Sequence, residues 1–482
     1  MIDLRPVGYV IGLLVALLGL AMFLPLLVDL ADGQGHWPAF AQSAVLTVMS
    51  GGLIALSCQN GTREGLTIQQ TFILTTLVWV ALPIFGALPF WFGATESRAV
   101  DAFFEAMSGL TTTGATVLSG LDQMPRGLLL WRGLLQWIGG IGIIVVAMVF
   151  LPELRVGGMQ IFRSEGFDTF GKILPRATEI SSRISSIYIG LTGICALAYL
   201  ATGMEPFDAS VHAMTTVATG GFANYDASFG AFGAGAEYVA VVFMMLAALP
   251  FVRFVQFTAG SARPLLQDPQ IRGFFATALV IVLGLTLWQF TQVVGPSEQA
   301  FRKVLFNVVS ILTGTGYAST DYMLWGVLPV AVIFFTGLIG GCAGSTACSV
   351  KIFRYQLLFA SIRAQLKRIR APHGVFTPRY QGRRISDDVL NSVMSFFVFF
   401  TVTLGLVSVL LSMTGLDFTT SISGAAAALA NIGPGLGDTI GPAGNFAALN
   451  DTAKWVISAT MLIGRLELLA VYAIFTLQFW RA

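Results

Sequence analysis

Long apolar runs follow one another along almost the whole chain. One crossing of a bilayer takes about 20 residues of helix, and runs of about that length lie at 7–30, 39–58, 70–92, 127–151, 184–203, 237–258, 274–293, 324–360, 389–413 and 453–479. Of the 482 residues, 55% are hydrophobic and 11% are charged, outside the range of soluble globular chains. We therefore predict an all-α integral membrane protein with about ten spans, the first a retained helix rather than a signal peptide.

Basic residues collect in the connection between the eighth and ninth runs. Cytoplasmic loops carry an excess of Lys and Arg, and this connection holds Lys351, Arg354, Arg363, Lys367, Arg368, Arg370, Arg379, Arg383 and Arg384. Threading ten spans puts the basic segments 155–183 and 253–272 on the same side, so both termini are expected in the cytoplasm. The net charge is only +2, and topology and membrane lipid head groups account for these loops, so no nucleic-acid partner is expected.

Cysteine and histidine form no pattern typical of a metal site or a catalytic centre. The three histidines lie far apart, and the cysteines lie in or beside apolar runs without metal-ligand spacing: Cys58, Cys195, Cys342 and Cys348. Core packing is the simpler interpretation for these thiols. A membrane enzyme would need a nucleophile with its base, or a metal cluster, so we expect neither an enzyme nor a bound cofactor.

One short pattern recurs four times. A helical stretch too short to span is followed by a loop rich in glycine, and then by a long apolar run; the stretches and loops are 101–122, 206–226, 297–321 and 417–438. Aligned on the loop, four glycines stand about a hundred residues apart: Gly114, Gly221, Gly316 and Gly433. The repeated module is one span, one short helix, one loop and one span.

Loops at membrane depth have a strict requirement. Non-helical N–H and C=O groups survive there only where protein or water lines them, so four such loops must face a shared aqueous path. Glycine enters positive φ without steric cost and lets successive carbonyls point the same way. Rings of carbonyl oxygens can replace the hydration shell of a monovalent cation, and helix C-terminal ends favour positive charge. We therefore predict one central cation pore.

The four loops resemble the selectivity-filter loops of the TrkH/TrkG branch of the Trk/Ktr/HKT superfamily: TTTGATVLSG (111–120), ATGGF (218–222), TGTGY (313–317) and NIGPGLGD (431–438). The similarity extends over nearly the whole chain, including 132–154, 157–165, 340–346 and 464–475. It implies potassium uptake across the bacterial inner membrane by a homodimer that is regulated by a TrkA-like cytosolic nucleotide-binding subunit. This chain itself carries no phosphate-binding or dinucleotide-binding motif.

The resemblance also implies a division into five parts. A two-helix preliminary domain is followed by four helix–pore-loop–helix repeats around one pore, with boundaries at 1–62, 63–152, 153–268, 269–370 and 371–482. By position, it assigns the potassium-binding filter to three residues of each loop: Thr112, Thr113 and Gly114; Thr219, Gly220 and Gly221; Gly314, Thr315 and Gly316; and Asn431, Ile432 and Gly433. Asn431 and Pro434 depart from the threonine pattern of the first loop, so a modest preference for potassium over sodium is expected.

Arg465 is the charge that stands out within a span. An isolated arginine at the centre of a spanning helix costs about 2.5–3.5 kcal/mol on insertion scales, so it should face water or a carboxylate. Glu467 is two residues away and points to another face of a helix, so it is not the expected partner. A pore-lining role below the filter, which the resemblance implies, is favoured over a structural ion pair.

Four further polar residues have simpler interpretations. Arg126 and Arg132 begin the fourth run, and both are expected to extend to the membrane interface. Glu105 and His212 lie on the short helices, where packing or hydrogen bonding is expected rather than ion binding.

The eighth run predicts a gate. Residues 324–360 are too many for one straight span, and small residues interrupt them at 337–351. Irregular backbone there must face protein or water, and the resemblance assigns an intramembrane gating loop to Gly340, Gly341, Gly344, Ser345, Ala347, Cys348, Ser349 and Lys351. A merely kinked helix is the alternative.

Transport needs no coupling ion on electrical grounds. A membrane potential of 100 mV contributes about 2.3 kcal/mol per charge, which is nearly fiftyfold accumulation. Carboxylates buried in the middle of spans are scarce. A gated channel-like route is therefore favoured over a cation-coupled symporter, whose halves would run in opposite directions.

Overall fold

The computed structural model describes residues 2–33, 35–61, 66–93, 95, 97–146, 159, 177–292 and 297–481. Within these residues the fold is helical, apart from one hairpin of two short antiparallel strands, β1 (Arg379–Tyr380) and β2 (Arg383–Arg384). Most of the predicted basic segment 155–183 lies outside the described residues, as do the predicted boundaries at 62/63 and 152/153.

Seven helical segments of the described chain are long and apolar enough to span a membrane: α1–α2 (Arg5–Ala21, Phe23–Ala31), α3 (Trp37–Cys58), α4–α5 (Ile68–Gly86, Leu88–Phe92), α7 (Arg126–Val145), α10 (Ala177–Ala201), α15 (Pro269–Gln292) and α19 (Asp387–Met413). An eighth span is possible if the pair α12 (Ala234–Ala247) and α13 (Phe251–Thr258), bent by 90°, counts as one. These helices establish a multi-pass membrane protein.

The sequence predicted about ten spans, with an interruption only in the eighth run, and the difference has a structural cause. Besides the bent α12–α13 pair, the eighth run is divided into α17 (Val327–Gly337) and α18 (Ile352–Arg370). The tenth run, expected to be continuous, is divided into α22 (Asp451–Arg465) and α23 (Leu469–Ile474). Arg465 therefore ends a helix rather than lying within one.

Four short helices precede the loops that the sequence singled out. They are α6 (Ala99–Leu110), α11 (Pro206–Val217), α16 (Glu298–Thr313) and α20 (Phe418–Ala430). Three of them begin with a recognisable signal: Ser297 before α16 and Asp417 before α20 accept hydrogen bonds from backbone N–H groups, and Pro206 occupies the first turn of α11. The remaining helices are short connectors: α14 (Arg263–Gln267), α21 (Gly437–Ile440) and α24 (Leu477–Arg481).

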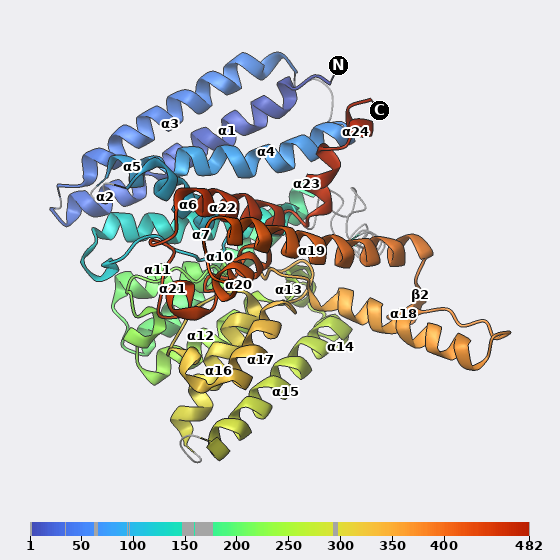
Figure 1. Cartoon of the computed structure of the whole chain (residues 1–482). Coiled ribbons are helices and arrows are strands. Elements are labelled where there is room, and N and C mark those ends of the chain that lie inside the picture. Colours follow the sequence, from blue (N-terminus) through green and yellow to red (C-terminus); the bar gives the residue numbers. More distant parts are fainter. Residues whose placement is uncertain are drawn as a thin grey trace.

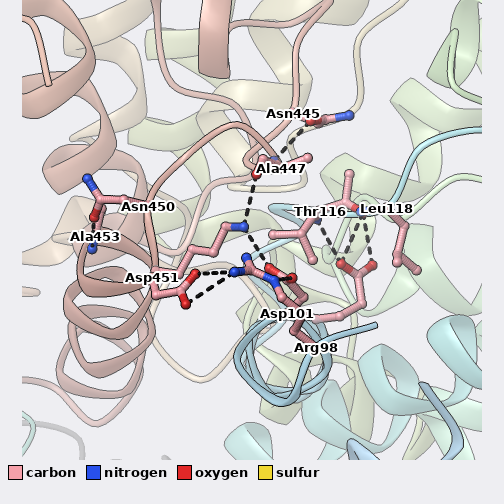
Figure 2. Close-up of polar contacts among 12 residues, drawn as sticks. Arg98, Asp101, Thr116, Leu118, Asn445, Ala447, Asn450, Asp451 and Ala453 are labelled. Atoms are coloured by element: carbon pink, nitrogen blue, oxygen red, sulfur yellow. Dashed lines mark hydrogen bonds and ion pairs between the residues drawn. The ribbon is translucent and has the colours of Figure 1, made fainter. Parts of the chain in front are cut away.

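Ion pairs connect segments that lie far apart in the chain. Figure 2 shows Arg98, the residue directly before α6, between Asp101 of α6 and Asp451 of α22. Arg98 lies 2.9 Å from Asp451, and the buried Lys454 of α22 donates to Asp101 at 2.6 Å. These ion pairs join the first short helix to the last long one, more than three hundred residues later in the chain.

Both termini and the basic helix α18 lie at one end of the molecule (Figure 1). Figure 1 also shows α18 with its hairpin projecting from that end. The last turn of α18 carries Lys367, Arg368 and Arg370. The first helices α1, α3 and α4 lie together along one side of the molecule.

Small residues bring α1 and α3 close together. A Cβ added to Gly12 would lie 2.5 Å from the backbone nitrogen of Ala55 and 2.7 Å from the carbonyl oxygen of Gly51. Without a hydrophobic force between helices in lipid, such close packing is a main source of association.

We expect Gly12→Leu to destabilise this helix pair by about 1–3 kcal/mol, because overpacking forces the backbones apart. Thermal unfolding of the detergent-solubilised protein measures the loss. Gly52→Leu is the matched control, since Gly52 is next to Gly51 and a Cβ there has no neighbour within 4 Å. Equal unfolding temperatures for the two variants would contradict the close contact.

Candidate functional site

The same backbone motif ends all four short helices. A residue with left-handed φ follows each helix: Thr112 (φ 50°), Thr219 (φ 50°), Gly314 (φ 78°) and Asn431 (φ 50°). The next N–H donates to a carbonyl five residues earlier, at 2.8–2.9 Å: Thr113 to Ser108, Gly220 to Thr215, Thr315 to Ser310, and Ile432 to Ala427. This is the hydrogen bond of a Schellman helix terminus. A left-handed threonine is uncommon and costs on the order of 1–3 kcal/mol, so surrounding structure must hold it.

Two residues after the left-handed residue, each loop has a glycine, and in three of the four loops this glycine also has a positive φ. Gly114, Gly221 and Gly316 have φ of 84°, 77° and 81°, a region that glycine enters without steric cost. Gly433 is not among the positive-φ residues, so the fourth loop differs from the other three in its backbone, as it does in its sequence. Pro434 follows it and restricts the preceding residue to extended conformations.

The four loops meet in a closed order. A Cβ on Gly114 would collide with the Gly220 carbonyl of the second loop, and a Cβ on Gly221 with the Thr315 carbonyl of the third. A Cβ on Gly316 would lie 2.7 Å from the Gly433 nitrogen, and a Cβ on Gly433 would lie 3.0 Å from the Gly114 carbonyl oxygen. Each loop therefore contacts the next, and the fourth contacts the first.

All four glycines line one open cavity with an empty volume of about 870 Å³. The backbone behind it is tied down by side-chain amides. Gln136 of α7 donates to the Gly220 carbonyl at 2.6 Å and accepts from the Phe222 N–H at 3.0 Å. Asn431 donates to the Thr113 hydroxyl at 3.0 Å and to the Met461 carbonyl at 2.9 Å. The structure thus brings the sequence-predicted filter residues of all four loops together.

Threonine hydroxyls in the loops are already engaged. Thr113 lies 2.8 Å from the Thr111 hydroxyl, and Thr315 lies 2.8 Å from the Thr313 hydroxyl. Thr219 donates to the Ala218 carbonyl at 2.8 Å. Backbone carbonyls, rather than these hydroxyls, are therefore the oxygen atoms that remain for a ligand, although the Gly220 carbonyl already accepts from Gln136.

A buried ion pair braces the first two loops, and it corrects one prediction. Arg132, expected at the membrane interface, is 1% exposed and lies 2.8 Å from Glu105. It also donates to the Ala223 carbonyl at 2.7 Å, while Glu105 accepts from the Val117 N–H at 3.0 Å. Neither residue carries a local sequence signal for this role, because the pairing depends on the meeting of α6, α7 and two loops.

Of two other polar residues, His212 is hydrogen-bonded, as the sequence predicted, and Arg126 lies at the surface of the molecule. His212 is fully buried, contacts the Asp208 carbonyl at 2.8 Å and accepts from the Asn224 N–H at 3.3 Å. Arg126 is half exposed and lies 3.8 Å from both Asp32 and Glu205, beside a second open cavity.

An acidic side chain at that second cavity changes the ionisation of a tyrosine. Tyr225 donates to Asp208 at 2.7 Å, and this hydrogen bond, together with partial burial, raises the pKa of Tyr225 to about 12. Tyr225 is therefore a neutral donor at physiological pH.

The interruption of the eighth run is a buried loop, residues 338–351, directly beside the four loops. Cys348 has its sulfur 3.9 Å from the Thr112 hydroxyl, and its backbone nitrogen would lie 3.6 Å from a Cβ on Gly314. The loop rests on the bend between α12 and α13, where the Cys342 N–H donates to the Ala248 carbonyl at 3.0 Å. Left-handed φ occurs at Gly340, Gly344, Ser349 and Lys351. The predicted loop residues therefore form one segment in contact with the first and third loops, not a kinked helix.

Arg465 contacts this loop. Its guanidinium donates to the Cys348 sulfur and, at 3.4 Å, to the Thr346 carbonyl. The side chain is 4% exposed, and its Nε has no hydrogen-bond partner within the described residues. Glu467 is directed elsewhere, to Lys351 and Arg354, as the spacing of two residues predicted. In the described chain no group of three or more His, Cys, Asp or Glu residues could hold a metal ion.

These features define a multi-pass helical membrane protein whose four short helices end in loops that meet around one point. A family model described as "Cation transport protein" matches residues 36–479, and the chain belongs to this family, TrkH.

Known relatives resemble the chain over its full length. It is 44% identical to the Trk system potassium uptake protein TrkI of Halomonas elongata, over 99% of this chain and 97% of the relative. It is 36% identical to the Trk system potassium uptake protein TrkH of Escherichia coli, over 99% of both chains. The crystal structure of the potassium transporter TrkH from Vibrio parahaemolyticus matches with a TM-score of 0.91 and 34% identity, over 100% of both chains.

We expect Arg132→Gln to lower the free energy of unfolding by about 3–5 kcal/mol, because it leaves Glu105 buried without its cation. Arg126→Gln is the control, and its loss should stay within about 1 kcal/mol, since its ion pairs are long and exposed. Thermal unfolding in detergent compares the two. Similar unfolding temperatures for both variants would mean that Arg132 is not the brace described.

Proposed function

We propose that this protein carries potassium across the bacterial inner membrane through a selectivity filter built by the four loops. The observation that carries this proposal is the closed order in which the loops contact one another around a single cavity. The relatives at 44% and 36% identity are named as potassium uptake proteins, and the similar crystal structure is titled a potassium transporter.

The filter uses backbone carbonyl oxygens. Left-handed residues on either side of the middle position allow neighbouring carbonyls to point to one side, whereas an extended strand alternates them. The filter positions of the first three loops have this pattern. The fourth loop departs from it at Gly433, whose φ is not positive. Carbonyl rings of this kind replace the hydration shell of a potassium ion. A carbonyl ring in which one of the four loops differs discriminates less strictly between potassium and sodium than a symmetric ring does.

The short helices support a cation electrostatically. Helices α6, α11, α16 and α20 all end at the loops, so the negative ends of four helix dipoles converge on the same point. Each short helix lies between a helix before it and a helix after it, in the same order each time. This order supports four pore repeats behind a two-helix preliminary domain, and it disfavours a coupled symporter with inverted halves.

The loop 338–351 and Arg465 form the gate. The loop lies against two of the four filter loops, with Cys348 next to Thr112 and Gly314. Arg465 adds a positive charge there. Two like charges about 5 Å apart repel by about 3 kcal/mol at an effective dielectric constant of 20, which opposes passage of potassium while the loop is in place.

Localisation and regulation follow from the same features. The basic helix α18 and both termini lie at one end of the molecule, which supports an even number of crossings with that end in the cytoplasm (Figure 1). The relatives are named as parts of a Trk system, which supports a partner subunit. A TrkA-like nucleotide-binding protein at the cytoplasmic end, and a homodimer of this chain, complete the proposal.

Substituting a filter glycine should reduce selectivity before it reduces folding. Gly221→Ser places a Cβ against the Thr315 carbonyl and strains a positive φ by about 1–2 kcal/mol, so the potassium-to-sodium flux ratio should fall about tenfold. Gly433→Ser should do less, because its φ is ordinary and its nearest contact is 3.0 Å. Rubidium, potassium and sodium fluxes in proteoliposomes measure this. Wild-type selectivity in the serine variants of Gly114, Gly221 and Gly316 would refute the filter.

Shortening the loop Gly340–Ser349 by several residues should raise potassium flux in the absence of any partner subunit, since it removes the obstruction and leaves the filter unchanged. The potassium-to-sodium ratio should stay at the wild-type value. The measurement is rubidium uptake by proteoliposomes that contain only this chain. A well-folded variant with wild-type flux would show that the loop is not a gate.

A further inference from the structure

Glu467 is a buried carboxylate between two buried cations. It lies 2.8 Å from the Lys351 ammonium and forms a second ion pair with the Arg354 guanidinium. The three residues are 4%, 5% and 0% exposed. Arg354 also stacks on the Phe396 ring at 3.8 Å and donates to the Val350 carbonyl at 2.8 Å. Three charges are thus held away from water at one point.

The ion pairs join two breaks in the helical framework. Lys351 is the last residue of the loop 338–351, directly before α18, and Glu467 lies in the break between α22 and α23. Both residues have left-handed φ, 73° and 62°, and Leu468 follows with 48°. None is glycine, so each conformation is strained and must be held by its surroundings. The bridge between Lys351 and Glu467 is the contact that can hold both.

The break in the tenth run therefore holds the loop at two points. Arg465 reaches Thr346 and Cys348 near the filter, and Glu467 reaches Lys351 at the end of the loop. The loop cannot leave its position unless Lys351 separates from Glu467 or the break at 466–468 moves with it.

We propose that Glu467 is a positioning residue that keeps the loop 338–351 in its blocking position and couples its movement to the break between α22 and α23. This inference rests on the gating role of the loop proposed above. Removing the carboxylate takes away the anion that lies 2.8 Å from the buried Lys351 ammonium, which favours states in which the loop end becomes hydrated. Glutamine keeps the shape of the side chain and removes only its charge.

The test measures rubidium flux in proteoliposomes that contain the full chain without a partner subunit. We expect Glu467→Gln to raise this flux about tenfold, which corresponds to about 1.4 kcal/mol in the balance between closed and open states. The potassium-to-sodium ratio should not change. Lys351→Met should act similarly, and the double variant should exceed neither single variant by much, because both remove the same contact. Glu467→Asp retains the charge and should lie close to wild type.

Glu237→Gln is the matched control. Glu237 is likewise a buried carboxylate, 1% exposed, and it lies 2.7 Å from Arg302 and 2.7 Å from Lys303. It joins α12 to α16, away from the loop. Its loss should lower the unfolding temperature without raising flux. An equal rise in flux with Glu237→Gln would mean general loosening and would overturn the proposal.

The remaining outcomes separate this inference from the gate itself. Wild-type flux in Glu467→Gln, together with raised flux in the shortened-loop variant, would overturn the role of Glu467 and leave the gate intact. Wild-type flux in both would overturn the two together. If Glu467→Gln does not fold, Lys351→Met decides: wild-type flux in that variant overturns the proposal, and raised flux supports it.

Discussion

Irregular backbone within a membrane must find partners, and most of this structure serves that need. The four loops end their helices with the same hydrogen bond, so the exposed carbonyls at each helix end are partly satisfied before any tertiary contact forms. Side-chain amides of Gln136 and Asn431 satisfy groups that remain. The loop 338–351 is held by the carbonyls of the α12–α13 bend. One break in a helix thus supplies the partners for another.

The sequence predicted the features that have a local cause. Glycine at regular positions after short helical stretches located the loops, and three of the four glycines have the expected left-handed φ. Small residues located the loop in the eighth run. The bend of the sixth run was not predicted, although Pro250 marks it at the start of α13. In each case a residue with unusual backbone freedom or restriction marks the place.

Other features have no local cause, and the sequence could not predict them. The tenth run breaks at Leu466, Glu467 and Leu468, and none of these residues is a glycine or a proline. At this break Glu467 is held by Lys351 and Arg354, which come from another part of the chain. Arg132 was expected at the interface, yet Glu105 holds it in the interior, 27 residues away in the sequence. The sequence marked the fourth loop as different through Asn431 and Pro434, but not the conformation of Gly433, whose φ is not positive and which Pro434 restricts.

Because one polypeptide supplies all four loops, each quarter of the ring has its own sequence. Asn431 stands where the first two loops have threonine, and it ties the fourth loop to the first through its amide. In a channel made of four identical subunits, a single substitution would appear four times around the axis. Here it appears once, so in the proposed filter ion preference would change in small steps, and the fourth loop can take on a structural role while the other three coordinate the ion.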